Sequence, residues 1–303
     1  MIDASDEQAH EPSDDEHAQE SWYFNWVDPR HDVFGLARLG YRYHTRAPEP
    51  LILTIAPHGL QVVYTPEHVS SEMEPWERLD AGRGLVAGDM RAIMEEPFAR
   101  WRLQLDGPNR MDLLFESYTP VFDYKEGGRE LAPSMTTAHF EQSCRVTGWT
   151  DFYGKRLEVA GLGQRDKSWG VRAWPRIEGW DWISAQFGED LSFNLMRTRE
   201  VGEVFVNGFV FRDGQNVAIR EADLRYEWGA VEHQPAETHL VLDDEAGRRH
   251  EIRGEMRAIF PLPRDPVQLE EAYSSFTYRG GAGESPREGR GVVEHVWRPV
   301  PQA

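Results

Sequence analysis

The strongest constraint on the fold of this chain is a repeated pattern of short segments in which apolar and polar residues alternate. Glycine, proline, asparagine and aspartate separate these segments from Ser21 onward, a pattern typical of antiparallel strands. The clearest case is 100–105 and 111–117 around Asp-Gly-Pro-Asn, which predicts a hairpin. The same reasoning predicts three more hairpins, from the segment pairs 141–150 and 156–161, 203–211 and 217–228, and 238–244 and 250–260.

Helical patterns are scarce. The two best candidates for amphipathic helices are residues 67–79 and 265–276. Many strands at short spacing with few helices favour β-barrels or β-sandwiches over parallel α/β layers. We therefore predict an all-β protein.

The 303 residues are long enough for two domains with separate cores. Residues 1–20 are acidic and polar, which predicts a disordered tail rather than part of a core. A boundary near 150 then divides the remainder into an N-terminal β domain, 21–150, and a C-terminal β domain, 151–303.

Composition excludes several classes of function. The chain has 33 Lys and Arg against 52 Asp and Glu, a net charge of −19 that opposes binding to nucleic acids or anionic lipids. A single cysteine, Cys144, permits no intrachain disulfide. With no secretion signal and no apolar run of about 20 residues, we expect a cytoplasmic protein without membrane insertion. Phosphate-binding, dinucleotide-binding and zinc motifs are missing, so we expect no metal and no cofactor.

The least ordinary stretch is "GLGQRDKSWGVRAW", residues 161–174, which combines glycines, an Arg-Asp pair and two tryptophans. A carboxyl group in an apolar pocket keeps its proton near neutral pH, and aromatic rings stabilise a nearby cation. Asp166 together with Trp169 and Trp174 fits proton transfer to a hydrophobic substrate. Arg165 is the candidate for organising charge around it.

This stretch resembles the signature of tandem lipocalin-like proteins that include bacterial carotenoid 1,2-hydratase (hydroxyneurosporene synthase), kievitone hydratase and AttH-like proteins. The matching positions are Gly161, Gly163, Asp166, Trp169 and Gly170. Further similarity to a poorly characterised branch of the group lies in "SWYFNW" with "GLARLGYR", "HFEQSCRVTG" and "GRGVVEHVW". The resemblance implies two tandem lipocalin-like β-barrel or β-sandwich domains with an apolar interdomain cavity, and it implies that Asp166 is the proton donor.

The chain departs from the hydratase pattern on both sides of the aspartate. Gln164 stands where the hydratases carry tyrosine, and Lys167 stands where they carry histidine. Two proton-relay groups are therefore missing. An architectural role for the motif, as a buried hydrogen-bonded corner, is the alternative to a catalytic one.

Other candidate residues lie outside the motif. Glu294 is either a second carboxylate or the partner of Arg165. His139 and Glu141 share one face of a predicted strand, as a catalytic dyad or as a hydrogen-bonded pair. Trp22 and Tyr23 either line a pocket or pack into the core. We include Gln164 and His139 with the aromatic residues as substrate-binding candidates.

The resulting hypothesis is a cofactor-independent hydratase, dehydratase or isomerase that acts on a hydrophobic terpenoid, steroid-like or polyphenolic molecule. Asp166, Glu294 and Arg165 are its predicted catalytic residues. Two alternatives stay open: a non-catalytic carrier of a lipophilic metabolite, and a cyclase that works mainly by preorganising its substrate.

Overall fold

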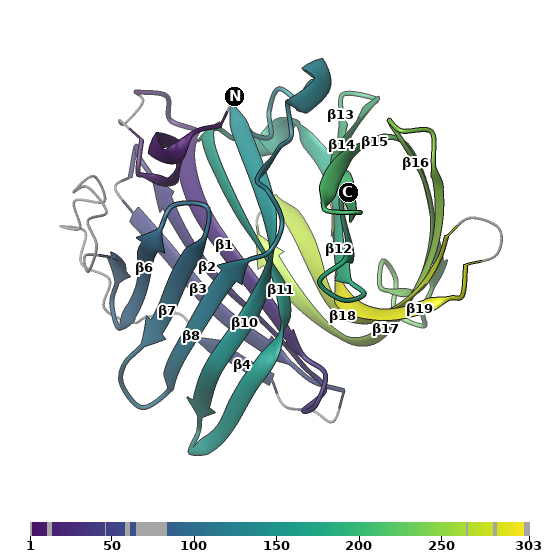
Figure 1. The fold of residues 1–303 in the computed structure, drawn as a ribbon. Coiled ribbons are helices and arrows are strands. Elements are labelled where there is room, and N and C mark those ends of the chain that lie inside the picture. The colour runs from purple at the N-terminus through teal and green to yellow at the C-terminus, as the bar shows by residue number, and fades with distance from the viewer. Residues whose placement is uncertain are drawn as a thin grey trace. The chain divides into compact units, whose positions relative to one another are not determined.

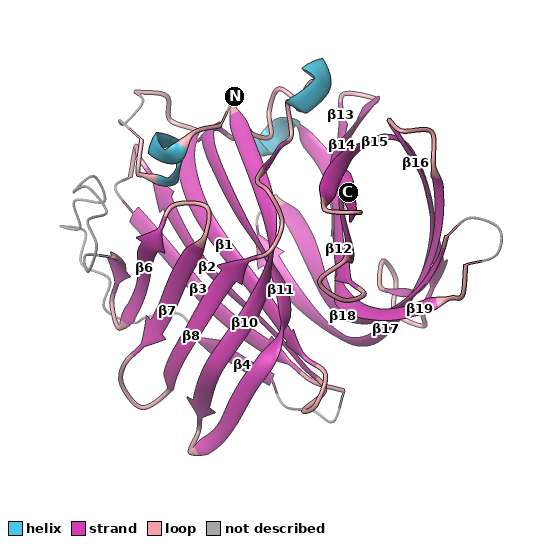
Figure 2. Cartoon of the chain, in the orientation of Figure 1, coloured by secondary structure: helices cyan, strands magenta, loops and turns pink. Residues whose placement is uncertain are grey.

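The computed structural model describes residues 2–10, 14–45, 47–57, 61–64, 84–264, 266–280 and 284–299. Nearly all of its regular structure is strand (Figures 1 and 2). The strands are β1 (Ala18–Asp28), β2 (Val33–Arg42), β3 (Ala47–Ile55), β4 (Gln61–Tyr64), β5 (Leu85–Ala87), β6 (Met90–Glu96), β7 (Arg100–Leu105), β8 (Arg110–Ser117), β9 (Phe122–Asp123), β10 (Ala138–Phe152), β11 (Lys155–Val171), β12 (Ile177–Gln186), β13 (Leu191–Glu200), β14 (Glu203–Arg212), β15 (Gln215–Trp228), β16 (Pro235–Asp244), β17 (Arg249–Arg264), β18 (Val267–Arg279) and β19 (Arg287–Trp297). Three short 3-10 helices complete the regular structure: η1 (Ala4–Glu7), η2 (Glu126–Gly128) and η3 (Trp174–Arg176).

The all-β prediction is confirmed, and so are the four predicted hairpins, which are β7–β8, β10–β11, β14–β15 and β16–β17. Within the described ranges, no helix has the length and apolar character that crossing a membrane requires.

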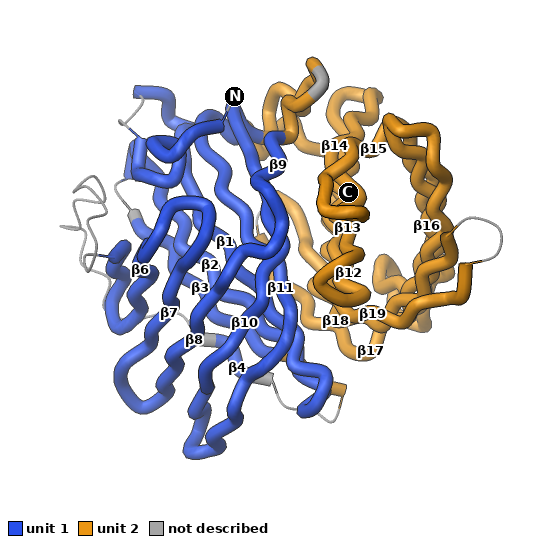
Figure 3. Tube along the Cα trace, viewed as in Figure 1, with its two compact units in different colours: residues 1–54, 60–123, 136–172 blue, residues 55–59, 124–135, 173–303 orange. Residues whose placement is uncertain are grey.

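The chain folds as two compact units (Figure 3). Unit 1 comprises residues 1–54, 60–123 and 136–172, and unit 2 comprises 55–59, 124–135 and 173–303. The division therefore falls after residue 172 and not after residue 150, because the long β10–β11 hairpin pairs with β1 and β8 of unit 1. The 161–174 stretch, which we had assigned to the C-terminal domain, lies mostly in unit 1.

Unit 1 is built on one curled antiparallel sheet with the strand order β4-β3-β2-β1-β11-β10-β8-β7-β6-β5. Strands far apart in sequence meet at its centre, where β1 pairs with β11. One face carries a large apolar core that includes Phe24, Trp101 and Phe115. The glycines of the signature permit this pairing, because a Cβ at Gly161 would lie 1.8 Å from the Val27 carbonyl oxygen and one at Gly163 would lie 1.9 Å from that of Asn25.

The prediction that residues 1–20 form a disordered tail has to be corrected. Residues 2–10 are placed against the sheet, and β1 begins at Ala18. Helix η1 ends in Glu7, which is 0% exposed and binds Arg165 at 2.5 and 3.1 Å. An acidic segment becomes ordered here because buried cations, which its own composition does not reveal, provide its partners.

Unit 2 contains a closed eight-stranded barrel in which β12 to β19 follow one another and β19 returns to pair with β12. This up-and-down order is that of lipocalin-like barrels. Its interior is filled by an apolar cluster that includes Ile183, Phe193, Leu240 and Val293.

The helix predicted for 265–276 is wrong, because these residues form most of β18. Nearly every residue from 267 to 274 is buried, on both faces of the strand, so the alternation that identifies a strand is lost. The helix predicted for 67–79 lies outside the described residues.

Candidate functional site

The centre of the unit 1 sheet carries a row of polar side chains on the face opposite the apolar core. Tyr23 on β1, Asp166 on β11 and Glu141 on β10 are direct cross-strand neighbours. Arg38 on β2 continues the row, opposite Tyr23. Because side chains two apart on a strand share a face, His139 lies beside Glu141 on the same surface.

Glu141 is the anchor of this face. It is fully buried, and each of its carboxylate oxygens has a partner: the His139 ring nitrogen at 2.8 Å and the Gln164 side-chain amide at 2.8 Å. Gln164 in turn accepts a hydrogen bond from the Ser143 hydroxyl at 2.9 Å, and its backbone N–H donates to Asn25 at 2.9 Å. Three strands are therefore joined by one hydrogen-bonded network.

Asp166 lies beside this network and is partly exposed. Burial, together with the negative charge of Glu141, raises the pKa of Asp166 to about 7, against the opposing effect of His139, Arg172 and Arg38. A carboxyl group with this pKa exchanges protons near neutrality, as a general acid or base must. Burial is the cause predicted from the sequence, and Glu141 is the neighbouring charge that adds to it.

The same three residues offer donor atoms to a cation. One oxygen of Glu141, one oxygen of Asp166 and one ring nitrogen of His139 lie within 4.8 Å of one another. A histidine with two carboxylates suits several divalent metals. At its present spacing, however, the cluster is already joined by the hydrogen bond between His139 and Glu141.

Arg165 and Lys167 point to the core face of the sheet. Arg165 is 1% exposed and binds Glu7 and the side-chain oxygen of Gln142. Lys167 binds Glu20 at 2.6 Å. Glu7 therefore takes the partner role that we had considered for Glu294, and Arg165 has no contact with Asp166 among the described residues. We assign Arg165 to the architecture of unit 1, against the expectation that it organises charge at the reacting carboxyl group.

The predicted aromatic residues fall on different sides of the sheet. Trp22 is 2% exposed and belongs to the core of unit 1. The prediction that Trp22 lines a substrate pocket is therefore wrong, and its alternative, packing into the core, holds. Tyr23 faces the other way, beside Asp166. Trp169 is stacked on His10, with ring centroids 4.2 Å apart, and so helps to hold the N-terminal segment.

Trp174 and Glu294 belong to unit 2. Trp174 begins η3 and lies 5.6 Å from the ring of Trp180, and the Trp180 indole N–H donates to Glu294. Glu294 is the cross-strand neighbour of Glu271 on β18. Burial, and then the charge of Glu294, raise the pKa of Glu271 well above the usual range of a glutamate. Sequence reasoning missed Glu271, because it lies in the segment interpreted as a helix.

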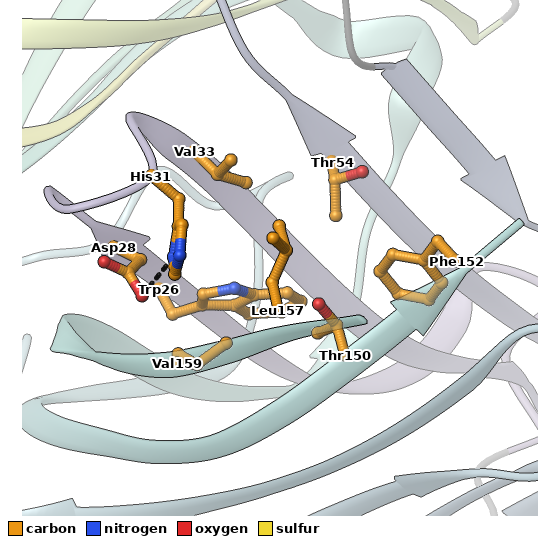
Figure 4. Close-up of a pocket in the computed structure, with 9 residues that line it drawn as sticks. All are labelled: Trp26, Asp28, His31, Val33, Thr54, Thr150, Phe152, Leu157 and Val159. Carbon is orange, nitrogen blue, oxygen red and sulfur yellow. Dashed lines mark hydrogen bonds and ion pairs between the residues drawn. The ribbon is translucent and has the colours of Figure 1, made fainter. Parts of the chain in front are cut away.

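A pocket of unit 1 lies at the other end of β1, with Trp26, Val33, Thr54 and Leu157 among its lining residues (Figure 4). His31 contacts Asp28 there at 3.1 Å. The volume of this pocket, about 10 Å³, is at most the size of one water molecule.

The single thiol of the chain is not a candidate nucleophile, because burial raises the pKa of Cys144 to about 11.

The fold defines the class of the protein: it is all-β, with two lipocalin-like units, of which the second is a closed barrel. Residues 3–299 match the family described as a domain of unknown function, DUF7064, and the chain belongs to that family. No functionally curated protein matches its sequence.

Several solved structures share the fold. CghA, crystallised with Sch210972, is similar with a TM-score of 0.70 and 13% identity, over 96% of this chain and 94% of CghA. An AttH-like protein from Nitrosomonas europaea has a TM-score of 0.66 and 17% identity, over 97% and 96% of the two chains. Kievitone hydratase from Nectria haematococca has a TM-score of 0.66 and 11% identity, over 97% and 91%. These structures bear out the predicted fold and include members of the group that the sequence resembles.

Proposed function

We propose that this protein is an enzyme that transfers protons to and from a hydrophobic small molecule, as a hydratase, dehydratase or isomerase, with Asp166 as the catalytic acid or base. The observation that carries the proposal is the position of Asp166. Its carboxyl group lies beside the fixed carboxylate of Glu141 and has a pKa of about 7. An acid of this strength holds a proton at neutral pH and can also release it.

The division of labour follows from the contacts. In hydration, protonated Asp166 gives its proton to one alkene carbon, water adds to the other carbon, and the proton that this water loses restores the acid. His139 and Glu141 are the groups beside Asp166 through which that proton can return. Gln164 acts as a positioning residue, because it fixes Glu141 through the amide contact. Dehydration is the reverse sequence of the same steps.

The structural relatives support the chemical class of the substrate. One of them is named as a hydratase, and another was crystallised with a small organic molecule. Their low identity leaves the substrate of this chain to experiment, because one fold hosts many reactions. A hydrophobic terpenoid, steroid-like or polyphenolic molecule is the substrate class that we propose.

Proton transfer can be tested before the substrate is identified. The purified protein is incubated with a mixed extract of hydrophobic metabolites in D2O, and the products are analysed by mass spectrometry. A hydratase adds one water and incorporates deuterium, a dehydratase removes one water, and an isomerase incorporates deuterium at an unchanged molecular formula. A carrier returns every ligand unlabelled.

The matched variants are Asp166→Asn and Glu158→Gln. Glu158 lies on the same strand, but its side chain is 66% exposed and pairs with Arg156. We expect Asp166→Asn to abolish both the change of mass by one water and the labelling, and Glu158→Gln to retain them. Full labelling by Asp166→Asn would exclude Asp166 as the proton-transfer group.

A further inference from the structure

The barrel of unit 2 contains a second group of charged side chains, which has no role in the proposed function. Asp181 on β12 is 0% exposed and accepts four hydrogen bonds. The donors are the ring of His295 at 2.7 Å, Arg199 Nη1 at 2.7 Å, the Tyr226 hydroxyl at 2.9 Å and Arg197 Nε at 3.1 Å.

These residues face the interior of the barrel. Asp181 is two positions from Ile183, and Arg197 is two positions from Leu195, both in the apolar cluster that fills the barrel. Strand alternation places all four side chains on the same inner wall. The charged group therefore occupies the end of the barrel at which β12 begins and β19 ends, beyond the apolar filling.

The two arginines use their guanidinium groups differently. Arg199 donates from Nη1 to Asp181 and from Nη2 to the Val296 carbonyl oxygen at 3.1 Å. Arg197 donates to Asp181 through Nε only, and its two Nη groups make no hydrogen bond to the residues that the structure describes. The Arg197 side chain is 23% exposed. The hydrogen bond from Nε thus orients the Arg197 guanidinium, and its two Nη groups are available to a ligand.

The neighbouring carboxyl group does not fill this position. Glu270 on β18 lies opposite His295 and accepts a hydrogen bond from Gln234 at 3.0 Å. Burial raises the pKa of Glu270 above its usual value. Arg197 and Arg199 therefore both donate to a single carboxylate, that of Asp181.

Two exposed apolar side chains lie at the same end of the barrel as Arg197. Trp228 ends β15 and is 51% exposed, and its ring lies 5.4 Å from that of His295 and 5.1 Å from that of Tyr226. Val204 is the cross-strand neighbour of Arg199 and is 58% exposed. Trp228, through its contacts with His295 and Tyr226, offers an apolar surface at the end of the barrel where Arg197 offers a charge.

We propose that this end of the unit 2 barrel binds a small organic acid that combines one carboxylate with an aromatic or aliphatic body. The carboxylate is held by the two outer Nη groups of Arg197, in the paired geometry that a guanidinium favours. The apolar body lies on Trp228 and Val204. The site is independent of Asp166 and does not require the proposed reaction.

Two probes of nearly equal shape test the charge requirement. Binding of 2-naphthoate and of the neutral 2-naphthalenemethanol is measured by isothermal titration calorimetry. We expect naphthoate to bind at least about tenfold more tightly than the alcohol, because hydrogen bonds to a charged group carry that much affinity. Equal affinity for the two probes would overturn the proposal.

Variants then locate the binding. Arg197→Gln should weaken naphthoate binding about tenfold or more while leaving the alcohol unchanged, and Trp228→Ala should weaken both probes. Arg225→Gln is the matched control, because Arg225 is 77% exposed on the outer wall of the same barrel and pairs with Asp223. Unchanged naphthoate affinity in Arg197→Gln contradicts the proposal.

Asp166→Asn separates this site from the proposed catalytic site. It should leave naphthoate binding intact, and loss of binding in Asp166→Asn alone would mean that the acid binds in unit 1. Should Arg197→Gln fail to fold, as judged by circular dichroism, the comparison of the two probes on the unmodified protein decides the question.

Discussion

Asp166 and Glu141 are cross-strand neighbours, and an oxygen of each carboxyl group lies within 4.8 Å of the other and of one ring nitrogen of His139. Glu141 is held by two hydrogen bonds of 2.8 Å, whereas Asp166 has no fixed partner of this kind among the described residues. The two carboxyl groups therefore differ in environment: hydrogen bonds fix the carboxyl group of Glu141, and none of this kind from the described residues fixes that of Asp166.

The first prediction concerns the pH dependence of hydration. Hydration needs the protonated form of Asp166, so kcat/KM should be constant at low pH and fall as pH rises through about 7. Glu141→Gln removes a charge that raises this pKa, and the descending limb should move to lower pH. Rates measured from pH 5 to 9 for both proteins test this, and a limb that stays in place would show that Glu141 does not set the pKa.

The second prediction concerns stability. The pKa of Asp166 is raised from 3.8 to about 7 by folding, so its contribution to the free energy of unfolding is greatest below pH 4 and is lost as pH rises through 7. Asp166→Asn cannot ionise and should be more stable than the unmodified protein at pH 8, by roughly 1 to 3 kcal/mol.

Urea unfolding at pH 5 and pH 8 measures this difference. The gain should shrink or disappear at pH 5, where Asp166 of the unmodified protein holds its proton. A variant that is less stable at pH 8 than at pH 5, relative to the unmodified protein, would mean that the Asp166 carboxylate is stabilised by the fold.

The sequence was sufficient for the fold where one face of a strand is exposed. The β7–β8 pair alternates buried and less buried residues, and its hairpin was predicted with the correct boundaries to within one residue. Strand β18 is buried on both faces, and there the helix prediction failed. Local periodicity reports burial on one side only, so it identifies strands at the surface better than strands inside the protein.

The candidate site was predictable in part. Alternation along "QRDKSW" correctly separates Asp166 from Arg165, and the spacing of His139 and Glu141 correctly places them on one face. The sequence does not show which distant strands meet, so the pairing of Asp166 with Glu141 and of Arg165 with Glu7 needed the structure. Partners contributed by segments more than 20 residues away have no local signal.

The third prediction tests the N-terminal segment. Glu7→Gln removes the negative partner of Arg165, whose side chain is 1% exposed. An uncompensated buried cation should lower the free energy of unfolding by about 3 to 5 kcal/mol. Glu16→Gln is the control, because the Glu16 side chain is 73% exposed, and it should change stability by less than about 0.5 kcal/mol. Equal effects of the two variants on urea unfolding would contradict the stabilising contact between Glu7 and Arg165 and would favour the predicted disordered tail.

The last prediction concerns Glu271, whose carboxyl group shares a hydrogen bond with Glu294 and is 3% exposed. Burial and the Glu294 charge raise the pKa of Glu271, so the group holds its proton to higher pH than an ordinary glutamate and can donate it to its neighbour. A glutamine amide also donates, so Glu271→Gln should change the free energy of unfolding by less than about 1 kcal/mol at pH 6.

The pH dependence of this variant distinguishes the two states of Glu271. As pH rises through the folded-state pKa, the unmodified protein loses the stability that the protonated form provides, and the variant does not. Thermal unfolding should therefore favour Glu271→Gln increasingly from pH 6 to pH 9. A large loss of stability at both pH values would show that the Glu271 carboxylate is ionised in the fold, and the assignment of a shared proton to this pair would be wrong.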